Sequence, residues 1–161
     1  MTTPGPAHDP HGELPIDGDT IGGVRPVHLS PASIALVLVG GTVGTAAREA
    51  LSLAIPPLGG IPVAIFAINV VGAFFLGVLL EALANRGPDV GRRRTLRLLL
   101  GTGFAGGFTT YSALAVDTGL LLTGGDALGG ILYGLGTVAV GALATVGGIT
   151  LAGTRREAAA R

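Results

Sequence analysis

The residues best suited to chemistry lie in a stretch rich in glycine and hydroxyl groups, 101–119, which reads GTGFAGGFTTYSALAVDTG. Glycines weaken a helix, and nearby hydroxyls can satisfy the backbone groups that a break sets free. We therefore expect a helix that is broken near its centre and whose bare carbonyl oxygens could hold a cation. The alternative is a kinked packing helix whose hydroxyls bond back to the preceding turn. The residues concerned are Gly103, Gly106, Gly107, Thr109, Thr110 and Ser112.

Four further polar residues stand out in apolar surroundings. Asn69 lies in the centre of its apolar run, where it either binds a ligand or forms a hydrogen bond between helices, and both roles stay open. Arg48 and Glu49 lie near one end of the first apolar run, and Asp117 lies toward the same end of the third if these helices run antiparallel. These charges either form ion pairs or reach the interface, or they line a vestibule in which Arg48 concentrates a small anion.

The elements that position these groups are helices in a membrane. Of the 161 residues, 48% are apolar and only 12% are charged, and the mean hydropathy is +0.67. A soluble domain carries about 25% charged residues. Four apolar runs can each cross a bilayer, which takes about 20 residues, and they lack the alternation of barrel strands. The sequence therefore predicts an all-α membrane protein with four transmembrane helices. The runs are 33–55, 61–83, 96–122 and 127–151.

The chain is predicted to have three parts. Residues 1–30, rich in Pro, Gly and Asp, form a disordered cytoplasmic tail. Residues 31–154 form the four-helix transmembrane domain, and residues 155–161 form a cytoplasmic C-terminal end. The formal net charge is zero, so no overall field attracts nucleic acid, and no nucleic-acid partner is expected.

The placement of arginine orients the helices. Five arginines lie in the loop before the third run and at its start, and three lie near the C-terminus, whereas the opposite side has Arg48 alone. By the positive-inside rule both termini are cytoplasmic, and the chain is a multi-pass protein of the cell (inner) membrane. The arginines on the cytoplasmic side are Arg86, Arg92, Arg93, Arg94, Arg97, Arg155, Arg156 and Arg161.

Glycines recur in pairs four residues apart, a spacing that lets helix backbones touch. Because the chain contains 29 glycines, chance is the alternative explanation. The pairs are Gly40 with Gly44, Gly103 with Gly107, Gly125 with Gly129, and Gly130 with Gly134.

Three motifs give the chain a resemblance to a known family. GGTVGTAAR at 40–48, NVVGAFFLG at 69–77 and GTGFAGGFTTYS at 101–112 resemble, in order and spacing, the small fluoride channels known as Fluc or CrcB proteins. The resemblance extends over residues 33–151. It implies an antiparallel dimer of four-helix subunits, with two narrow fluoride pores and a structural sodium ion (Na+) at the dimer interface.

The resemblance also implies roles for individual residues. The main-chain carbonyls of Gly106 and Thr109 would hold the sodium, and Asn69 would donate a hydrogen bond to fluoride. The family's two pore-facing phenylalanines fall at Tyr111 and Leu114, so the chain departs from the pattern at both positions. An aromatic ring offers an anion its electropositive edge, which Leu114 lacks, whereas Tyr111 has a hydroxyl donor.

A neighbouring run of hydroxyl residues is also reduced. Of that run, Ser112 remains, while Ala113 and Ala115 take the other positions. How these changes affect the pore stays open.

The arginine bias predicts an unequal pair of subunits. An antiparallel homodimer must insert both ways up, which requires an even distribution of Arg and Lys, whereas this chain should insert one way only. We therefore expect a heterodimer with a homologous subunit of opposite bias, which would supply the missing phenylalanine and hydroxyls.

The function implied by the resemblance is passive export of fluoride, which reduces its toxicity. HF enters the cell, dissociates in the neutral cytoplasm, and the trapped anion leaves through the pore, so no enzyme activity is expected. One alternative is a structural partner that assembles with a conducting homologue but carries no ion. Another is a small multidrug-type exporter, which needs a membrane-embedded Glu in the first span, whereas Glu49 lies near its end.

Overall fold

The structure is a computed structural model that describes residues 30–159, with side chains described through Thr154. Within this range the chain consists of helices joined by short loops, and it contains no strand. The predicted tail, 1–30, lies outside the described residues except for Ser30. The all-α architecture expected from the sequence is confirmed for the described part.

Three of the four predicted spans are single helices: α1 (Pro31–Ala54), α2 (Val63–Ala84) and α6 (Ala127–Ala159). In α1, α2 and the segment Ala127–Thr154, the length and apolar composition suffice to cross a membrane. Pro31 begins α1, where its fixed φ suits the first helical turn. The loop after α1 contains Gly59 and Gly60, both with positive φ, and it reverses the chain within a few residues.

The remaining span is assembled from several pieces. It begins with α3 (Arg92–Leu96), continues as a π-helix, η2 (Arg97–Ala105), and as the short α4 (Gly106–Phe108), and ends with α5 (Tyr111–Thr123). Between α4 and α5, Thr109 and Thr110 have extended backbone, with ψ of 155° and 123°. The predicted break is confirmed, but it lies at the two threonines, because the preceding glycines remain helical.

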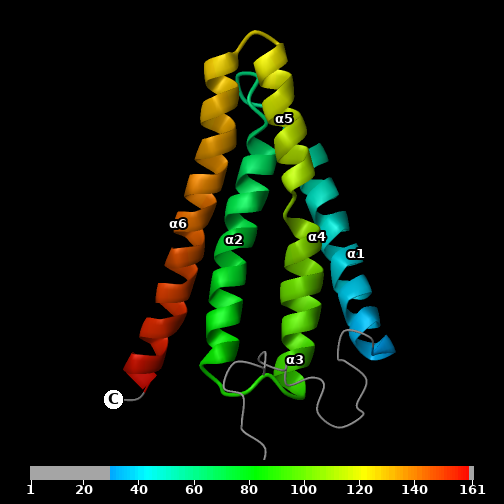
Figure 1. Cartoon of the computed structure of the whole chain (residues 1–161), viewed down its shortest axis with the longest axis vertical. Helices are drawn as coiled ribbons and strands as arrows, with labels where there is room; N and C mark the ends of the chain where they lie inside the picture. The colour runs from blue at the N-terminus through cyan, green and yellow to red at the C-terminus, as the bar shows by residue number, and fades with distance from the viewer. Residues whose placement is uncertain (1–29, 160–161) are drawn as a thin grey trace, which may run out of the picture.

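The four spans alternate in direction, as Figure 1 shows. The start of α1, the α2–α3 loop and the end of α6 lie at one end of the molecule, and the α1–α2 loop and the α5–α6 turn lie at the other. The arginine-rich loop and the arginines at the end of α6 therefore share one end, as the charge pattern predicted. In the middle of the molecule, α2 packs against α6 on one side and η2 on the other, while α1 packs against η2 and α4.

Glycines allow α1 to touch the third span. A Cβ atom at Gly40 would collide with the carbonyl oxygen of Leu99, and one at Gly44 would collide with that of Phe104. On the other side of this contact, a Cβ atom at Gly107 would collide with the backbone of Gly41. The predicted glycine pairs 40/44 and 103/107 are therefore packing sites between two backbones.

The other two predicted pairs have different outcomes. Gly130 and Gly134 face Thr118 of α5, so this pair packs as expected. Gly125 has a φ of 94° in the α5–α6 turn, and Gly129 faces the carboxylate of Asp126, so that pair serves the turn. A contact that the spacing did not indicate joins α2 to α6, where position 77 faces the backbone at 145 and position 148 faces the backbone at 74.

Phenylalanine side chains fill the space beside these contacts. The ring of Phe104 lies edge-on to Phe75 of α2, with centroids 5.9 Å apart, and stacks on Phe108, with centroids 5.5 Å apart. Phe108 belongs to the buried core with Ile68, whose side chain is 2% exposed. The core therefore continues on both sides of the break, with Phe108 before it and Leu114 after it.

The glycine contacts predict a position-specific cost for one added methyl group. We expect Gly44→Ala to destabilise the protein by about 1–3 kcal/mol because its Cβ would overlap the backbone of the third span. Gly147→Ala is the matched control in α6, since a Cβ there meets nothing within 4 Å, and alanine is favoured over glycine in a helix by about 1 kcal/mol. Thermal unfolding in detergent measures the stability of both variants. Equal unfolding temperatures for the two variants would contradict the proposed backbone contact at Gly44.

Candidate functional site

Asn69 of α2 holds the break in the third span. Its Oδ1 accepts a hydrogen bond from the backbone N–H of Thr110 at 2.8 Å, and its Nδ2 donates to the carbonyl oxygen of Thr110 at 3.0 Å. Thr110 is buried, with 7% of its surface exposed. A buried backbone group without a partner is costly in a membrane, and the Asn69 amide satisfies two of them at once. The predicted hydrogen bond between helices is therefore present, and one Nδ2 hydrogen remains for another acceptor.

The hydroxyl of Thr110 caps the helix that begins after the break. Its Oγ1 accepts a hydrogen bond from the backbone N–H of Ala113 at 3.2 Å, as an N-cap residue does. The same Oγ1 lies 3.2 Å from the Oγ of Ser112, and either hydroxyl can donate to the other. One of the two hydroxyl hydrogens forms the hydrogen bond between them, so the other hydroxyl hydrogen remains unused. Among the described residues, no other acceptor for this second hydrogen occurs. The pair therefore offers one O–H donor to a bound group.

The end of α4 leaves carbonyl oxygens available. The carbonyl oxygen of Ala105 accepts from both the backbone N–H and the Oγ1 of Thr109, at 2.9 and 2.8 Å. That of Gly107 accepts from the Thr45 hydroxyl at 3.4 Å. Within 30–159, no donor is found for the carbonyl oxygens of Gly106 and Thr109, because the N–H of Thr110 is turned to Asn69 and that of Ala113 to the Thr110 hydroxyl. These two oxygens are the ones that the resemblance assigned to sodium.

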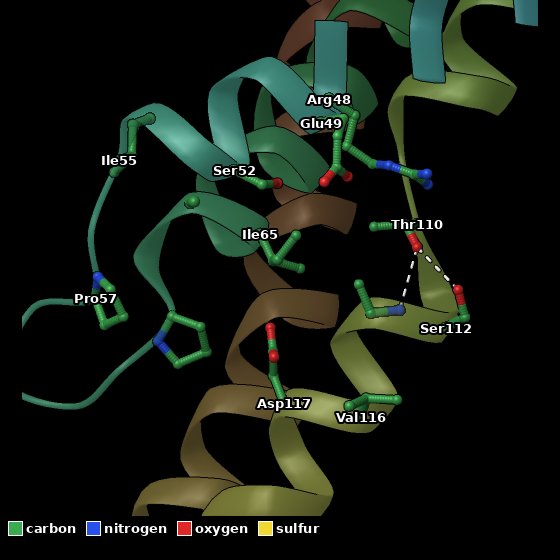
Figure 2. Close-up of a pocket in the computed structure, with 13 residues that line it drawn as sticks. Arg48, Glu49, Ser52, Ile55, Pro57, Ile65, Thr110, Ser112, Val116 and Asp117 are labelled. Atoms are coloured by element: carbon green, nitrogen blue, oxygen red, sulfur yellow. Dashed lines mark hydrogen bonds between the residues drawn. The ribbon is translucent and has the colours of Figure 1, made fainter. Parts of the chain in front are cut away.

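Two cavities meet at Thr110. One, of about 500 Å³, lies between α1, the start of α2 and α5, and we call it the vestibule; its polar lining residues are Arg48, Glu49, Ser52, Thr110, Ser112 and Asp117. Figure 2 shows Arg48 extending from α1 toward the third span, where Thr110 and Ser112 lie. The other cavity, of about 310 Å³, lies between α2, α5 and α6 and includes Asn69, Thr109 and Thr110. Thr110 thus lies at the boundary between the vestibule and this second space, which we call the inner cavity and which is open beside the exposed Tyr111.

The charges of the vestibule lie together, as the antiparallel arrangement predicted. Arg48, Glu49 and Asp117 all line it. Among the described residues, ion pairs join only Asp89 to Arg94 and Arg97, so these three vestibule groups are not paired with one another. Because Glu49 and Asp117 line the same cavity as Arg48, the vestibule has no formal excess of positive charge. Recognition of an anion there depends on directed donors.

The two positions that correspond to pore phenylalanines differ in exposure. Tyr111 is 81% exposed, whereas Leu114 is 6% exposed and packs in the core beside Ile65. Both side chains line the inner cavity. Tyr111 therefore presents its hydroxyl outward from the subunit, and Leu114 forms an apolar wall.

Sequence reasoning missed two polar residues of α6. Tyr133 and Thr137 are buried, and Thr137 lines the inner cavity opposite Asn69. The Tyr133 hydroxyl donates toward the carbonyl oxygen of Pro62 at 3.2 Å and the Oδ2 of Asp117 at 3.4 Å. Their spacing of four residues places both on one face of α6, within its apolar first half, which is the signal that could have found them.

The capping geometry predicts different effects for two substitutions at one position. Thr110→Val removes the hydroxyl that caps α5 and should cost about 1 kcal/mol, whereas Thr110→Ser keeps it. Thermal unfolding should therefore show a lower midpoint for the valine variant alone. Wild-type midpoints for both variants would mean that the hydroxyl does not stabilise the break.

Comparison with known proteins places the chain in a family. Residues 35–149 match the family described as CrcB-like protein, Camphor Resistance (CrcB). The chain is 59% identical over 126 residues to the fluoride-specific ion channel FluC 2 of Leifsonia xyli subsp. xyli, covering 78% of this chain and 87% of that protein. It is 50% identical over 114 residues to FluC 1 of Cutibacterium acnes, covering 70% and 80%, and 41% identical over 124 residues to FluC of Chlorobaculum tepidum, covering 74% and 94%. The chain therefore belongs to the CrcB family of multi-pass membrane proteins.

Proposed function

We propose that this chain is a subunit of a fluoride-selective channel that lets cytoplasmic fluoride leave the cell passively. The observation that carries the proposal is the broken third span, in which donors and carbonyl oxygens are available inside the membrane. The relatives named above are fluoride-specific ion channels, not enzymes. Nothing in the geometry favours an exporter, because Glu49 lies exposed in the last two turns of α1.

The donors near Thr110 suit a small anion. A dehydrated fluoride ion needs short hydrogen bonds to replace its water, and charge-assisted bonds of this kind are the strong ones. Asn69 contributes its second Nδ2 hydrogen and the pair formed by Thr110 and Ser112 contributes one O–H, whereas Tyr111, which is 81% exposed, offers its hydroxyl at the surface of the subunit. Arg48 serves in the vestibule as a local charge, and Leu114 keeps the inner wall apolar. This arrangement supports a path from the vestibule past Thr110 to the inner cavity.

The available carbonyl oxygens suit a sodium ion. Hard cations prefer oxygen ligands, and the carbonyl oxygens of Gly106 and Thr109 lack donors within the described residues. A side chain does not cover Gly106, because a Cβ there would meet nothing within 4 Å. A bound sodium would supply positive charge beside these oxygens. With Gly106 exposed on the surface of the subunit, a second subunit could provide the remaining ligands.

The role of Asn69 predicts a loss of transport. Asn69→Ala removes the donor to fluoride and both hydrogen bonds to Thr110, so fluoride efflux from liposomes should fall while the protein still assembles. Size-exclusion chromatography checks assembly, and a fluoride electrode measures efflux. Thr145→Ala is a suitable control, because its hydroxyl lines the same cavity but bonds mainly within α6, to the Gly141 carbonyl at 3.0 Å. Efflux equal to wild type in Asn69→Ala would contradict a pore role for this residue.

The distribution of arginine supports an antiparallel heterodimer in the cell membrane. Five arginines in 86–97 and those at the end of α6 lie at one end, and Arg48 belongs to the opposite half. A single orientation with both termini in the cytoplasm follows from the positive-inside rule. An antiparallel partner must then be a homologue of opposite bias. The relatives' numbered names, FluC 1 and FluC 2, are in keeping with paired homologues.

The heterodimer predicts transport only from a mixture. Liposomes that contain this chain alone, or a homologue of opposite bias alone, should lose fluoride slowly, whereas liposomes that contain both should lose it fast. The chain has no cysteine, so single introduced cysteines report orientation by labelling from either side. Rapid efflux from this chain alone, with both orientations labelled, would overturn the heterodimer and leave the channel in place. Efflux from the homologue alone, unchanged by this chain, would contradict a role for this chain in the conducting pore.

A further inference from the structure

We propose that Asp89, through its ion pair with Arg97, positions the π-helix η2 and thereby the groups at the break in the third span. Asp89 is then a positioning residue. It lies just before the start of the third span, whereas the proposed ion sites lie at the break in the middle of that span. Its effect on transport rests on the proposed function, whereas its effect on η2 does not.

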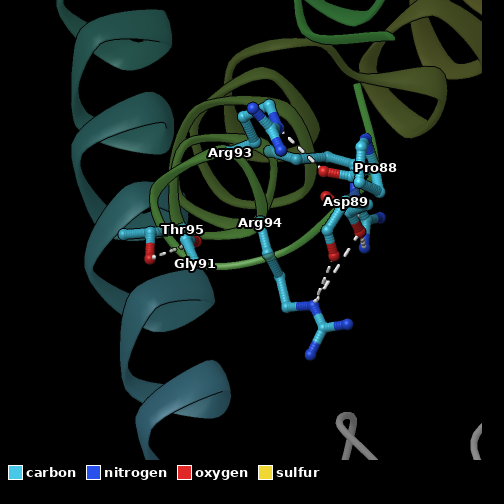
Figure 3. A network of polar contacts seen from close by, with 7 residues as sticks. Pro88, Asp89, Gly91, Arg93, Arg94 and Thr95 are labelled. Atoms are coloured by element: carbon cyan, nitrogen blue, oxygen red, sulfur yellow. Dashed lines mark hydrogen bonds and ion pairs between the residues drawn. The ribbon is translucent and has the colours of Figure 1, made fainter. Parts of the chain in front are cut away.

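The ion pair lies in a loop that is braced by arginine side chains. The Arg97 guanidinium contacts one carboxylate oxygen of Asp89 twice, through Nη2 at 2.6 Å and Nε at 2.8 Å. Arg93 donates to the carbonyl oxygens of Pro88 and Arg86 at 2.7 and 2.9 Å. Arg94 donates to the carbonyl oxygen of Asp89 at 3.0 Å, and Figure 3 shows this network around the start of the third span. The loop therefore holds Asp89 in a fixed place.

The pair persists at neutral pH. The hydrogen bond from Arg97 lowers the pKa of Asp89 below its usual value, against a smaller opposing effect of burial. A lowered pKa in the folded state means that the contribution of this carboxylate is present at neutral pH and is lost only as the pH falls through that value. The vestibule carboxyl groups belong to the opposite end of the molecule and do not face Asp89.

Two polar contacts hold the third span to the residues that precede it, one from the loop between α2 and α3 and one from α2. One is the pair formed by Asp89 and Arg97, at the first residue of η2, and the other is the double hydrogen bond between Asn69 and Thr110, at the break. The segment 97–110 therefore lies between two fixed points. A π-helix of nine residues is unusual, because such helices are rare and mostly single turns at functional sites. Because both of its ends are held, this segment keeps the i→i+5 hydrogen bonds of a π-helix instead of changing to the i→i+4 bonds of an α-helix.

Backbone contacts transmit any movement of this segment. Gly40 and Gly44 of α1 leave no space for η2 to shift sideways, since the carbonyl oxygens of Leu99 and Phe104 already touch them. If Arg97 is released, η2 can change to i→i+4 bonding, which lengthens η2 and rotates α4. The carbonyl of Gly106 would then change direction.

Exposure of the pair separates positioning from overall stability. The side chains of Arg97 and Asp89 are 40% and 43% exposed, and ion pairs at this exposure contribute little to stability. Loss of the pair should therefore leave the unfolding temperature nearly unchanged while it alters η2.

The test uses Asp89→Asn, Arg97→Gln and the double variant, with Arg92→Gln as the matched control. Arg92 is exposed, and no hydrogen bond or ion pair of its side chain occurs in the described structure, so its removal changes the arginine count as Arg97→Gln does. Hydrogen exchange in lipid nanodiscs, followed by mass spectrometry, reports on peptides from 97–108 and, for comparison, from α6. Fluoride efflux is measured in the assembly that conducts.

We expect both single variants to accelerate exchange in 97–108 and to reduce efflux by up to about 5-fold, the largest shift that the loss of an exposed ion pair can produce. The double variant should show the same exchange rate and the same efflux as either single variant, because each single substitution already removes the whole interaction. Exchange and efflux equal to those of Arg92→Gln would overturn the proposal, as would additive effects. Faster exchange in a protein whose wild type carries no fluoride would overturn the proposed function and support the positioning role.

Discussion

The absence of water in the bilayer core is the constraint on which the structure depends. Every backbone group there needs a partner from the protein, so a helix can open only where side chains replace its lost bonds. Asn69 does this for Thr110, because one amide side chain reproduces the donor and the acceptor of a peptide group. The break is stable for this reason, and the carbonyl oxygens that remain beyond its reach become available to ions.

Close backbone contact makes this arrangement possible. The glycines of α1 bring that helix against η2, and the contact between α2 and α6 is equally tight at Gly77 and Gly148. Asn69 therefore lies within hydrogen-bond distance of a residue 41 positions away. Since each glycine gives up helix stability in exchange for proximity, their abundance reflects the short distances that the site requires. The same tight packing leaves few ways for η2 to move independently.

Much of the architecture was predictable from local patterns. Hydropathy predicted the spans, glycine spacing indicated close contacts between helix backbones without identifying the partner helix, and the hydroxyl-rich stretch predicted a break. The exact place of the break was not predictable, because it depends on Asn69 reaching Thr110 across two helices. The π-helix was also missed, since a one-residue change in hydrogen bonding leaves no mark on composition. The role of Asp89 was not predictable either, because its contact with Arg97 depends on how the loop between α2 and α3 folds.

The most direct test of this mechanism is a density map of the assembled channel in lipid, with sodium and fluoride present. We expect extended backbone at Thr109 and Thr110, a cation against the carbonyl oxygens of Gly106 and Thr109, and an anion beside the Asn69 amide. An unbroken helix from Arg97 to Thr123, with acyl chains against Gly106 and no ion nearby, would contradict it.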